Sequence, residues 1–478
     1  MPADHYDAII VGSGAGGAAA AYHLVNAGRR VLLLEKGNDL PRDGSTLDID
    51  RVVHRGEFLR KEVWHDGAGT AFAPEEHFNV GGKTKWYGAA LLRFSRAEFA
   101  ADAAHGCHAW PIGYDDLEPY YTHAEQLLGV RRLPVEPGLQ NILSKLCGLT
   151  SPWQADPMPM GLSSAIGGYP LEARHFDGFA SVAGLKGEAD VSLLAPLRGR
   201  ANFMLQVGAE VVALCGDPQQ STRVTGVRLA DGRVLHATSI LLAAGALHSP
   251  RLLARYLDAT TLASTLPAAR NVGRNLKLHL LTAMVSMGVL RQSDLIRKTM
   301  VITHAQFRHS SVQPLGFDGE LMGTLVPKFV PRWLANQLGA RSYGFFLQTE
   351  DGSDANNRVF ETRGDVEVTR VMDYNVARLA TATAEHRGFT HALRTALLRA
   401  GLLSFTQRIG LAGTAHACGT LIAGDDPETS VVSARGGVHG MHGLFVVDGS
   451  ILPRSSRVNP SLSIYAWGLR VADLLTRQ

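Results

Sequence analysis

Three glycines and one acid near the start of the chain have the spacing of a dinucleotide-binding site. Gly12, Gly14 and Gly17 form a G-x-G-x-x-G pattern, and Glu35 follows the third glycine by 18 positions. In this pattern the first glycine allows a tight turn, the second lets a pyrophosphate approach the backbone, and the third lets a helix pack on a strand. An acid about 20 positions further on binds a ribose hydroxyl. The pattern predicts a dinucleotide cofactor but does not decide between NAD and FAD.

The elements that must position these residues are a strand, a helix and a second strand. The apolar run 8–11 predicts a buried strand before the turn, and the run 31–34 predicts a strand that ends at Glu35. A helix is expected from about Ala15 to Val25, with its free N–H groups and positive dipole end facing the phosphates. The alternative is a glycine-rich turn in an ordinary βαβ unit.

The composition is that of an ordinary globular enzyme. The chain has 478 residues, of which 45% are hydrophobic and 19% are charged, and its formal net charge is +3. This length suggests two or three domain-sized units. Because the net charge is small, we expect neither a nucleic-acid partner nor a membrane partner.

Targeting and metal-binding signals are weak. The sequence has no run of 18 apolar residues, and its first residues lack the basic and apolar regions of a signal peptide, so we expect a cytoplasmic protein. The four cysteines include no C-x-x-C pair, which favours reduced thiols. The stretch 105–108 contains two histidines and a cysteine but lacks a second half, so we expect no metal site.

Further patterns follow in the middle and at the end of the chain. Strands are predicted at 202–214, 223–229, 233–236, 239–246, 344–348, 366–371 and 444–450. A hairpin turn is expected at Asp231-Gly232, and helices are expected to begin at Ser249 and Asn459. A longer helix is expected from about Ala377 to Gly401. Because dinucleotide-type elements occur at the start, middle and end, we expect two interleaved domains.

Eight motifs occur in a fixed order along nearly the whole chain. They are the glycine pattern with Glu35, Val80-Gly-Gly, Trp110-Pro, 243–253, 271–279, His416-Ala-Cys-Gly-Thr, Asp448-Gly-Ser and Asn459-Pro. Together they resemble the glucose–methanol–choline (GMC) family of FAD-dependent oxidoreductases. The stretch 81–91 is most similar to a bacterial subgroup that acts on sugar and aminoglycoside hydroxyls.

This resemblance implies an α/β fold with two domains and FAD rather than NAD as cofactor. A Rossmann-like FAD-binding domain would comprise residues 1–95, 180–289 and 411–478. An α+β substrate domain, built on an antiparallel sheet, would comprise residues 96–179 and 290–410.

The resemblance also assigns residues to the cofactor. The glycine pattern and Glu35 would hold the ADP half, Val211 would face the adenine, and Asp448 would flank the ribityl chain. A helix that begins at Pro460 would point its N-terminus at the flavin, where a positive dipole end favours the negative charge of reduced flavin. The expected FAD contacts are Gly12, Gly14, Ala15, Gly17, Glu35, Gly81, Gly82, Thr84, Val211, Ala244, Gly245, Asp448, Gly449, Pro460 and Ser461.

The expected catalytic pair is His416 and Asn459. Hydride leaves an alcohol carbon more readily when the hydroxyl proton is removed, and an imidazole can accept that proton at neutral pH. An amide N–H from Asn459 can hydrogen-bond the substrate oxygen and orient it. We therefore expect oxidation of a primary or secondary alcohol to an aldehyde or ketone, with oxygen or another carrier as electron acceptor.

Several positions depart from the family pattern. Trp86 stands where some members attach FAD through a histidine, so we expect non-covalent FAD. Tyr87 stands where others have an asparagine that contacts the flavin. His248 is interpreted as an exposed residue at a helix start, and His279 as structural.

The expected substrate is a sugar, glycoside or aminoglycoside. Glu350, Asp351 and Asp354 either meet an amino sugar or form a solvated turn, and the second interpretation is favoured. The alternatives are oxidation of a sterol or aryl alcohol, cyanohydrin cleavage with FAD as a bystander, a non-catalytic flavin-binding subunit, and an NAD-dependent dehydrogenase.

Overall fold

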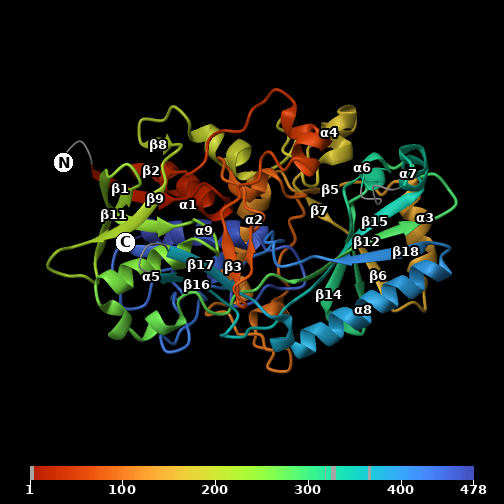
Figure 1. Cartoon of the computed structure of the whole chain (residues 1–478). Helices are drawn as coiled ribbons and strands as arrows, with labels where there is room; N and C mark the ends of the chain where they lie inside the picture. Colours follow the sequence, from red (N-terminus) through yellow and green to blue (C-terminus); the bar gives the residue numbers. More distant parts are fainter. Residues whose placement is uncertain (1–4, 318, 325–329, 364–367, 478) are drawn as a thin grey trace.

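Two sheets lie at opposite ends of the protein in the computed structural model, which describes residues 5–317, 319–324, 330–363 and 368–477 (Figure 1). The first sheet carries the glycine pattern. In it β1 lies between β2 and β11 and runs parallel to both, while β9 and β10 add an antiparallel edge. Its seven strands are β1 (His5–Val11), β2 (Val31–Leu34), β8 (Phe203–Gln206), β9 (Val211–Gly216), β10 (Val224–Leu229), β11 (Val234–Leu242) and β19 (Leu444–Val446).

The second sheet is antiparallel throughout, as the resemblance implied. In spatial order its strands are β18 (Leu403–Arg408), β12 (Leu280–Met287), β15 (Ser342–Thr349), β14 (Phe307–Pro314), β13 (Met300–His304) and β6 (Trp153–Pro157). Phe389 and Leu393 of α8 pack with Tyr343 and Phe345 of β15 in one apolar core. The expected combination of a Rossmann-like α/β part and an α+β part built on an antiparallel sheet is therefore confirmed.

The remaining elements connect and cover these sheets. A third sheet contains β16 (Arg358–Arg363), β17 (Val368–Asp373), β3 (Trp64–Asp66) and β4 (Ala71–Phe72). A fourth sheet pairs β5 (Arg131–Arg132) with β7 (Pro159–Met160). The helices are α1 (Ala15–Asn26), α2 (Tyr114–Leu127), α3 (Pro137–Leu146), α4 (Pro170–His175), α5 (Ser249–Ala259), α6 (Gly319–Thr324), α7 (Arg332–Gly339), α8 (Ala380–Arg399) and α9 (Ser461–Thr476). Within the described residues, none of the helices combines the length and apolar character that crossing a bilayer requires.

Some of the predicted elements differ from the observed ones. The single strand expected at 202–214 is two strands, because the chain turns at Gly208, which has a φ of +61°. One strand, β11, replaces the two expected at 233–236 and 239–246, and it ends at Leu242. Its first three residues pair with β10, and the residues from His236 to Leu242 pair with β1. The last predicted strand ends at Val446, and Asp448 then caps a short 3-10 helix.

The expected domain boundaries stay a prediction, and one element bears on them. The strand β12 belongs to the second sheet, although the sequence places it at the end of segment 180–289. Residues 366 and 367 of another predicted strand lie outside the described residues, and β17 is described from Val368.

Small residues let α1 and α9 pack closely against each other beside the first sheet. Eight residues of α1 are buried, most of them alanine or glycine. A Cβ atom on Gly16 would lie 1.7 Å from the carbonyl oxygen of Val447, and one on Gly468 would lie 2.6 Å from that of Gly16. Helix α1 is followed by Gly28, which lies in the left-handed region. The N–H groups of Gly28 and Arg29 donate to the last carbonyls of α1.

We predict that Gly16→Ala destabilises the protein by about 1–3 kcal/mol or more, because its methyl group would collide with backbone that cannot move alone. The measurement is the midpoint of thermal unfolding. Gly168→Ala is the matched control, since no atom of the described chain lies within 4 Å of a Cβ placed there. Equal midpoints for both variants would contradict the prediction.

Candidate active site

The three glycines of the pattern do different things at the end of β1. Gly12 has a φ of +105°, and a Cβ there would lie 2.3 Å from the carbonyl oxygen of Ala243. A Cβ on Gly17 would lie 2.0 Å from the oxygen of Gly12. Around Gly14, in contrast, no described atom lies within 4 Å of a Cβ position. Two of the glycines are thus needed for packing, whereas the second presents bare backbone to open space.

Gly81 and Gly82 lie beside this turn. Both have positive φ values, and a Cβ on Gly82 would lie 3.3 Å from the Cα of Gly14. The N–H of Gly81 donates to Ser13 Oγ at 3.0 Å. Thr84 Oγ1 donates to the Gly81 carbonyl at 2.6 Å, so its hydroxyl shapes the turn. We call the backbone around Gly12, Gly14, Gly81 and Gly82 the glycine cradle.

Glu35 closes one side of the glycine cradle at the end of β2. It is buried, and its Oε2 accepts hydrogen bonds from the Ser13 N–H at 3.1 Å and from Ser13 Oγ. Its Oε1 accepts from the Gly37 N–H at 2.8 Å. Burial raises the pKa of this carboxyl group despite these bonds. Ser13, which the sequence analysis missed, therefore links Glu35 to Gly81. The only sequence signal for it is a polar residue between two pattern glycines.

A second acid organises the opposite side of the cradle. Asp448 is buried and accepts from the Gly245 N–H at 2.9 Å and from Ser249 Oγ. Ser249 Oγ accepts in turn from the Ala244 N–H at 3.1 Å. Gly245 has a φ of +84° and no described atom within 4 Å of its Cβ position. The other expected contacts are the first helical residue of α1 (Ala15), the first residue of β9 (Val211), the start of a 3-10 helix (Gly449), the N-cap of α9 (Pro460) and its first residue (Ser461).

These features fit FAD. The carboxyl ends of β1, β2 and β11 meet at one edge of the sheet, which is where open α/β sheets bind their ligands. Bare backbone at Gly14 and Gly245 leaves room for a pyrophosphate beside the N-terminus of α1. The individual contacts stay predictions.

His416 and Asn459 come together, as the resemblance implied. His416 Nε2 lies 3.2 Å from Asn459 Nδ2, and Asn459 Oδ1 accepts a hydrogen bond from Gln313 of β14. Burial lowers the pKa of His416 well below its ordinary value, and His279, Lys298 and Lys83 lower it further. His416 is therefore a neutral imidazole at pH 7 and can accept a proton.

His279 packs against His416, with ring centroids 4.9 Å apart. Its Nε2–H donates to the Ser456 carbonyl at 2.8 Å, and its φ of +63° is unusual for a side chain of this size. The residue is anchored as well as buried. Its structural interpretation agrees with these contacts, although it lies at the site.

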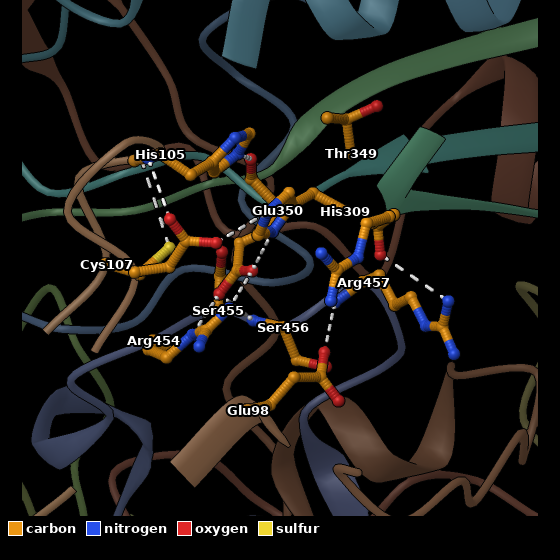
Figure 2. A network of polar contacts seen from close by, with 12 residues as sticks. Glu98, His105, Cys107, His309, Thr349, Glu350, Arg454, Ser455, Ser456 and Arg457 are labelled. Carbon is orange, nitrogen blue, oxygen red and sulfur yellow. Dashed lines mark hydrogen bonds and ion pairs between the residues drawn. The ribbon is translucent and has the colours of Figure 1, made fainter. Parts of the chain in front are cut away.

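Three buried acids hold the segment that leads to Asn459, and Figure 2 shows two of them, Glu98 and Glu350. Glu350 pairs with Arg454 through two hydrogen bonds of 2.8 and 2.6 Å. Glu98 accepts from the Arg457 N–H at 3.0 Å and from the Ser456 hydroxyl. The third acid, Asp351, accepts from Ser455 Oγ at 2.7 Å. Because the segment has no regular secondary structure, these side chains take the place of a backbone ladder.

Neither interpretation of Glu350 and Asp351 was right. Both residues are fully buried, so they do not form a solvated turn. Their oxygens are bonded to protein donors, which include the Tyr374 hydroxyl at 2.8 Å for Asp351, so they do not face a substrate. Asp354 is half-buried and accepts from the Asn356 N–H at 2.8 Å, as a turn residue does.

The departures from the family pattern also have definite places. His248 is not exposed, because its Nε2 lies 3.2 Å from buried Glu76 and its Nδ1 lies 2.9 Å from Arg251. Tyr87 donates its hydroxyl proton to the Gly187 carbonyl. The indole N–H of Trp86 donates to Asn79 Oδ1 at 3.0 Å.

One group of titratable residues has the composition of a metal site but the wrong geometry. The ligand atoms of His105, His309 and Glu385, and those of Cys107, His309 and Glu350, lie within 4.8 Å of one another. The two imidazole rings are stacked 3.7 Å apart and 8° from parallel (Figure 2). An imidazole binds a metal ion in the plane of its ring, so the stacked rings of His105 and His309 in the first group are not placed to bind one ion together. In the second group, Arg454 already neutralises Glu350.

We predict that Glu350→Gln lowers the free energy of unfolding at pH 7 by about 3–5 kcal/mol, because it leaves Arg454 buried without its counter-charge. Although burial alone would raise it, Arg454 and His309 hold the pKa of Glu350 well below its ordinary 4.5. The ionised carboxylate therefore stabilises the protein above about pH 4.5. The difference from wild type should shrink as the pH falls below that value. Denaturant unfolding measures it, with exposed Asp425→Asn as control.

Known protein families match an N-terminal and a C-terminal segment of the chain. A GMC oxidoreductase family model matches residues 349–468, and an NAD(P)-binding Rossmann-like domain model matches residues 10–77. Paromamine 6'-oxidase of Streptomyces fradiae is 29% identical over 99% of this chain and 92% of its own length. The 6'''-hydroxyparomomycin C oxidase of Streptomyces lividus is 28% identical over 98% of this chain and 90% of its own.

A solved structure shares the fold. Pyridoxine 4-oxidase from Mesorbium loti has a TM-score of 0.60 at 18% identity and covers 98% of each chain. The Rossmann-like sheet, the glycine cradle and the C-terminal motifs thus agree with the family matches. Residues 349–468 thus match a GMC oxidoreductase domain, and the chain is a FAD-dependent enzyme that oxidises an alcohol.

Proposed function

We propose that the enzyme oxidises a hydroxyl group of a sugar, glycoside or aminoglycoside, with His416 as base and Asn459 as the group that orients the substrate. The observation that carries this proposal is the 3.2 Å approach of His416 Nε2 to Asn459 Nδ2. Two relatives that match this chain along nearly their whole length are named as oxidases of aminoglycoside compounds. Their names favour this substrate class.

The two side chains complement a hydroxyl group. Because Asn459 Oδ1 accepts from Gln313, the amide N–H groups face His416. A hydroxyl between them would donate its proton to His416 Nε2 and accept from the Asn459 amide. The C–H bond then breaks with its electron pair as the C=O bond forms. FAD, when bound, supplies the acceptor for that hydride.

We further propose that FAD is held without a covalent bond, because Trp86 occupies the attachment position and its ring stacks on His77 at 4.6 Å. Oxygen or another carrier would reoxidise the flavin. The cytoplasm stays the proposed location, and the free state of all four cysteines agrees with it.

The first experiment is an anaerobic absorbance spectrum of the purified holoenzyme, before and after addition of sugars, aminoglycosides and simple alcohols. We expect flavin bands that bleach with an amino sugar or sugar. His416→Gln should lower the bleaching rate about 10²- to 10⁴-fold, the usual contribution of a general base. His439→Gln is the control, because that histidine bonds the Gly424 carbonyl in a separate loop. Substrate consumed without bleaching would favour cyanohydrin cleavage.

The pH dependence provides a separate check. Since the pKa of His416 is lowered, the imidazole stays unprotonated at pH values where an ordinary histidine is already charged. We expect the acid limb of the kcat/KM profile to lie below pH 6.5. A limb at or above that value would contradict the environment assigned to His416.

A further inference from the structure

Lys83 lies inside the glycine cradle motif, yet its side chain reaches the loop of His416. It follows Gly82 directly, and its Nζ donates to the Thr414 carbonyl at 2.8 Å and contacts Thr414 Oγ1 at 3.1 Å. Thr414 is fully buried and precedes His416 by two residues. The sequence separation of 331 residues makes this a direct link between two distant parts of the chain.

We infer that Lys83 is a positioning residue for His416, because its ammonium group fastens the loop of this histidine to the cofactor cradle. The inference rests on the proposed role of His416 as base. It gives Lys83 a task that a small polar residue after the paired glycines could not perform, since such a residue would lack both the length and the charge of this side chain.

The ammonium group is also paired with a buried acid. Lys83 forms an ion pair of 2.5 Å with Glu76, whose second oxygen meets His248 at 3.2 Å. Thr414 Oγ1 also lies 3.1 Å from Glu76. Although burial alone would raise it, Lys83 and His248 hold the pKa of Glu76 well below its usual range. Glu76 is therefore ionised and fixes the position of Lys83.

The charge of Lys83 acts on the imidazole as well. The charged and titratable neighbours that lower the pKa of His416 are His279, Lys298 and Lys83. Lys298 is paired with Asp177 at 2.7 Å. Removal of Lys83 would take one of these positive charges away, so the pKa of His416 should rise. A purely mechanical anchor would not have this effect.

The test compares Lys83→Met and Lys83→Arg in the holoenzyme. The methionine variant keeps an unbranched apolar stem but loses the charge and the donors. We expect kcat/KM to fall about 10- to 100-fold through loss of positioning. The acid limb of its pH profile should move up by about half a unit or more. The arginine variant keeps both charge and donors and should restore both quantities.

Thr414→Val weakens the anchor without changing the charge. It removes the Oγ1 contacts but keeps the bond from Lys83 to the carbonyl of residue 414 and the pair of Lys83 with Glu76. We expect a lower kcat/KM with an unmoved acid limb. Lys61→Met is the matched control, because Lys61 is exposed, and it should change neither quantity.

A measurement that does not depend on turnover reads the same imidazole. Diethylpyrocarbonate modifies unprotonated histidine, and mass spectrometry of the peptide with His416 reports its rate at each pH. We expect the midpoint to rise in Lys83→Met and to return in Lys83→Arg. An unchanged midpoint together with an unchanged kcat/KM in Lys83→Met would overturn the inference. Turnover that survives His416→Gln would instead overturn the base role, and the modification midpoint would still test Lys83.

Discussion

The close approach of bare backbone at the end of β1 is the constraint on which the structure depends. Gly12 meets the carbonyl of Ala243 and Gly16 meets that of Val447, with no room for a side chain at either contact. These contacts join the start, middle and end of the chain at one edge of the sheet. The cofactor site can form only when all three segments have come together, which explains why its residues are scattered along the sequence.

Around this edge, buried charge does the work of secondary structure. The segments before Asn459 and before His416 lack helix or strand, and backbone groups in them bond to the side chains of Glu98 and Lys83 instead. Buried ion pairs add little net stability compared with apolar packing, but they permit few alternative arrangements. In this enzyme they hold an imidazole and an amide at a defined separation, and geometry is what hydride transfer requires.

The sequence was most informative where local pattern and global fold agree. The helix at Ala15 and the strand Val31–Leu34 appear as predicted, because glycine spacing and apolar runs are local signals. Burial is not a local signal, so Glu350 looked like a surface residue although Arg454, 104 positions away, neutralises it. For the same reason nothing in the sequence marks Gln313 or Glu76. Their partners lie on other segments and become neighbours only in the folded chain.

The Gln313–Asn459 hydrogen bond has a consequence for chemical selectivity. With its oxygen occupied, Asn459 offers only donors to the site, while neutral His416 offers only an acceptor. A hydroxyl satisfies both, since it donates and accepts at once. An ammonium group has three donors and no acceptor, so the amide N–H groups of Asn459 would face another donor and form no hydrogen bond. On a molecule that carries both groups, this polarity alone would direct the reaction to oxygen-bearing carbons and leave the amines intact.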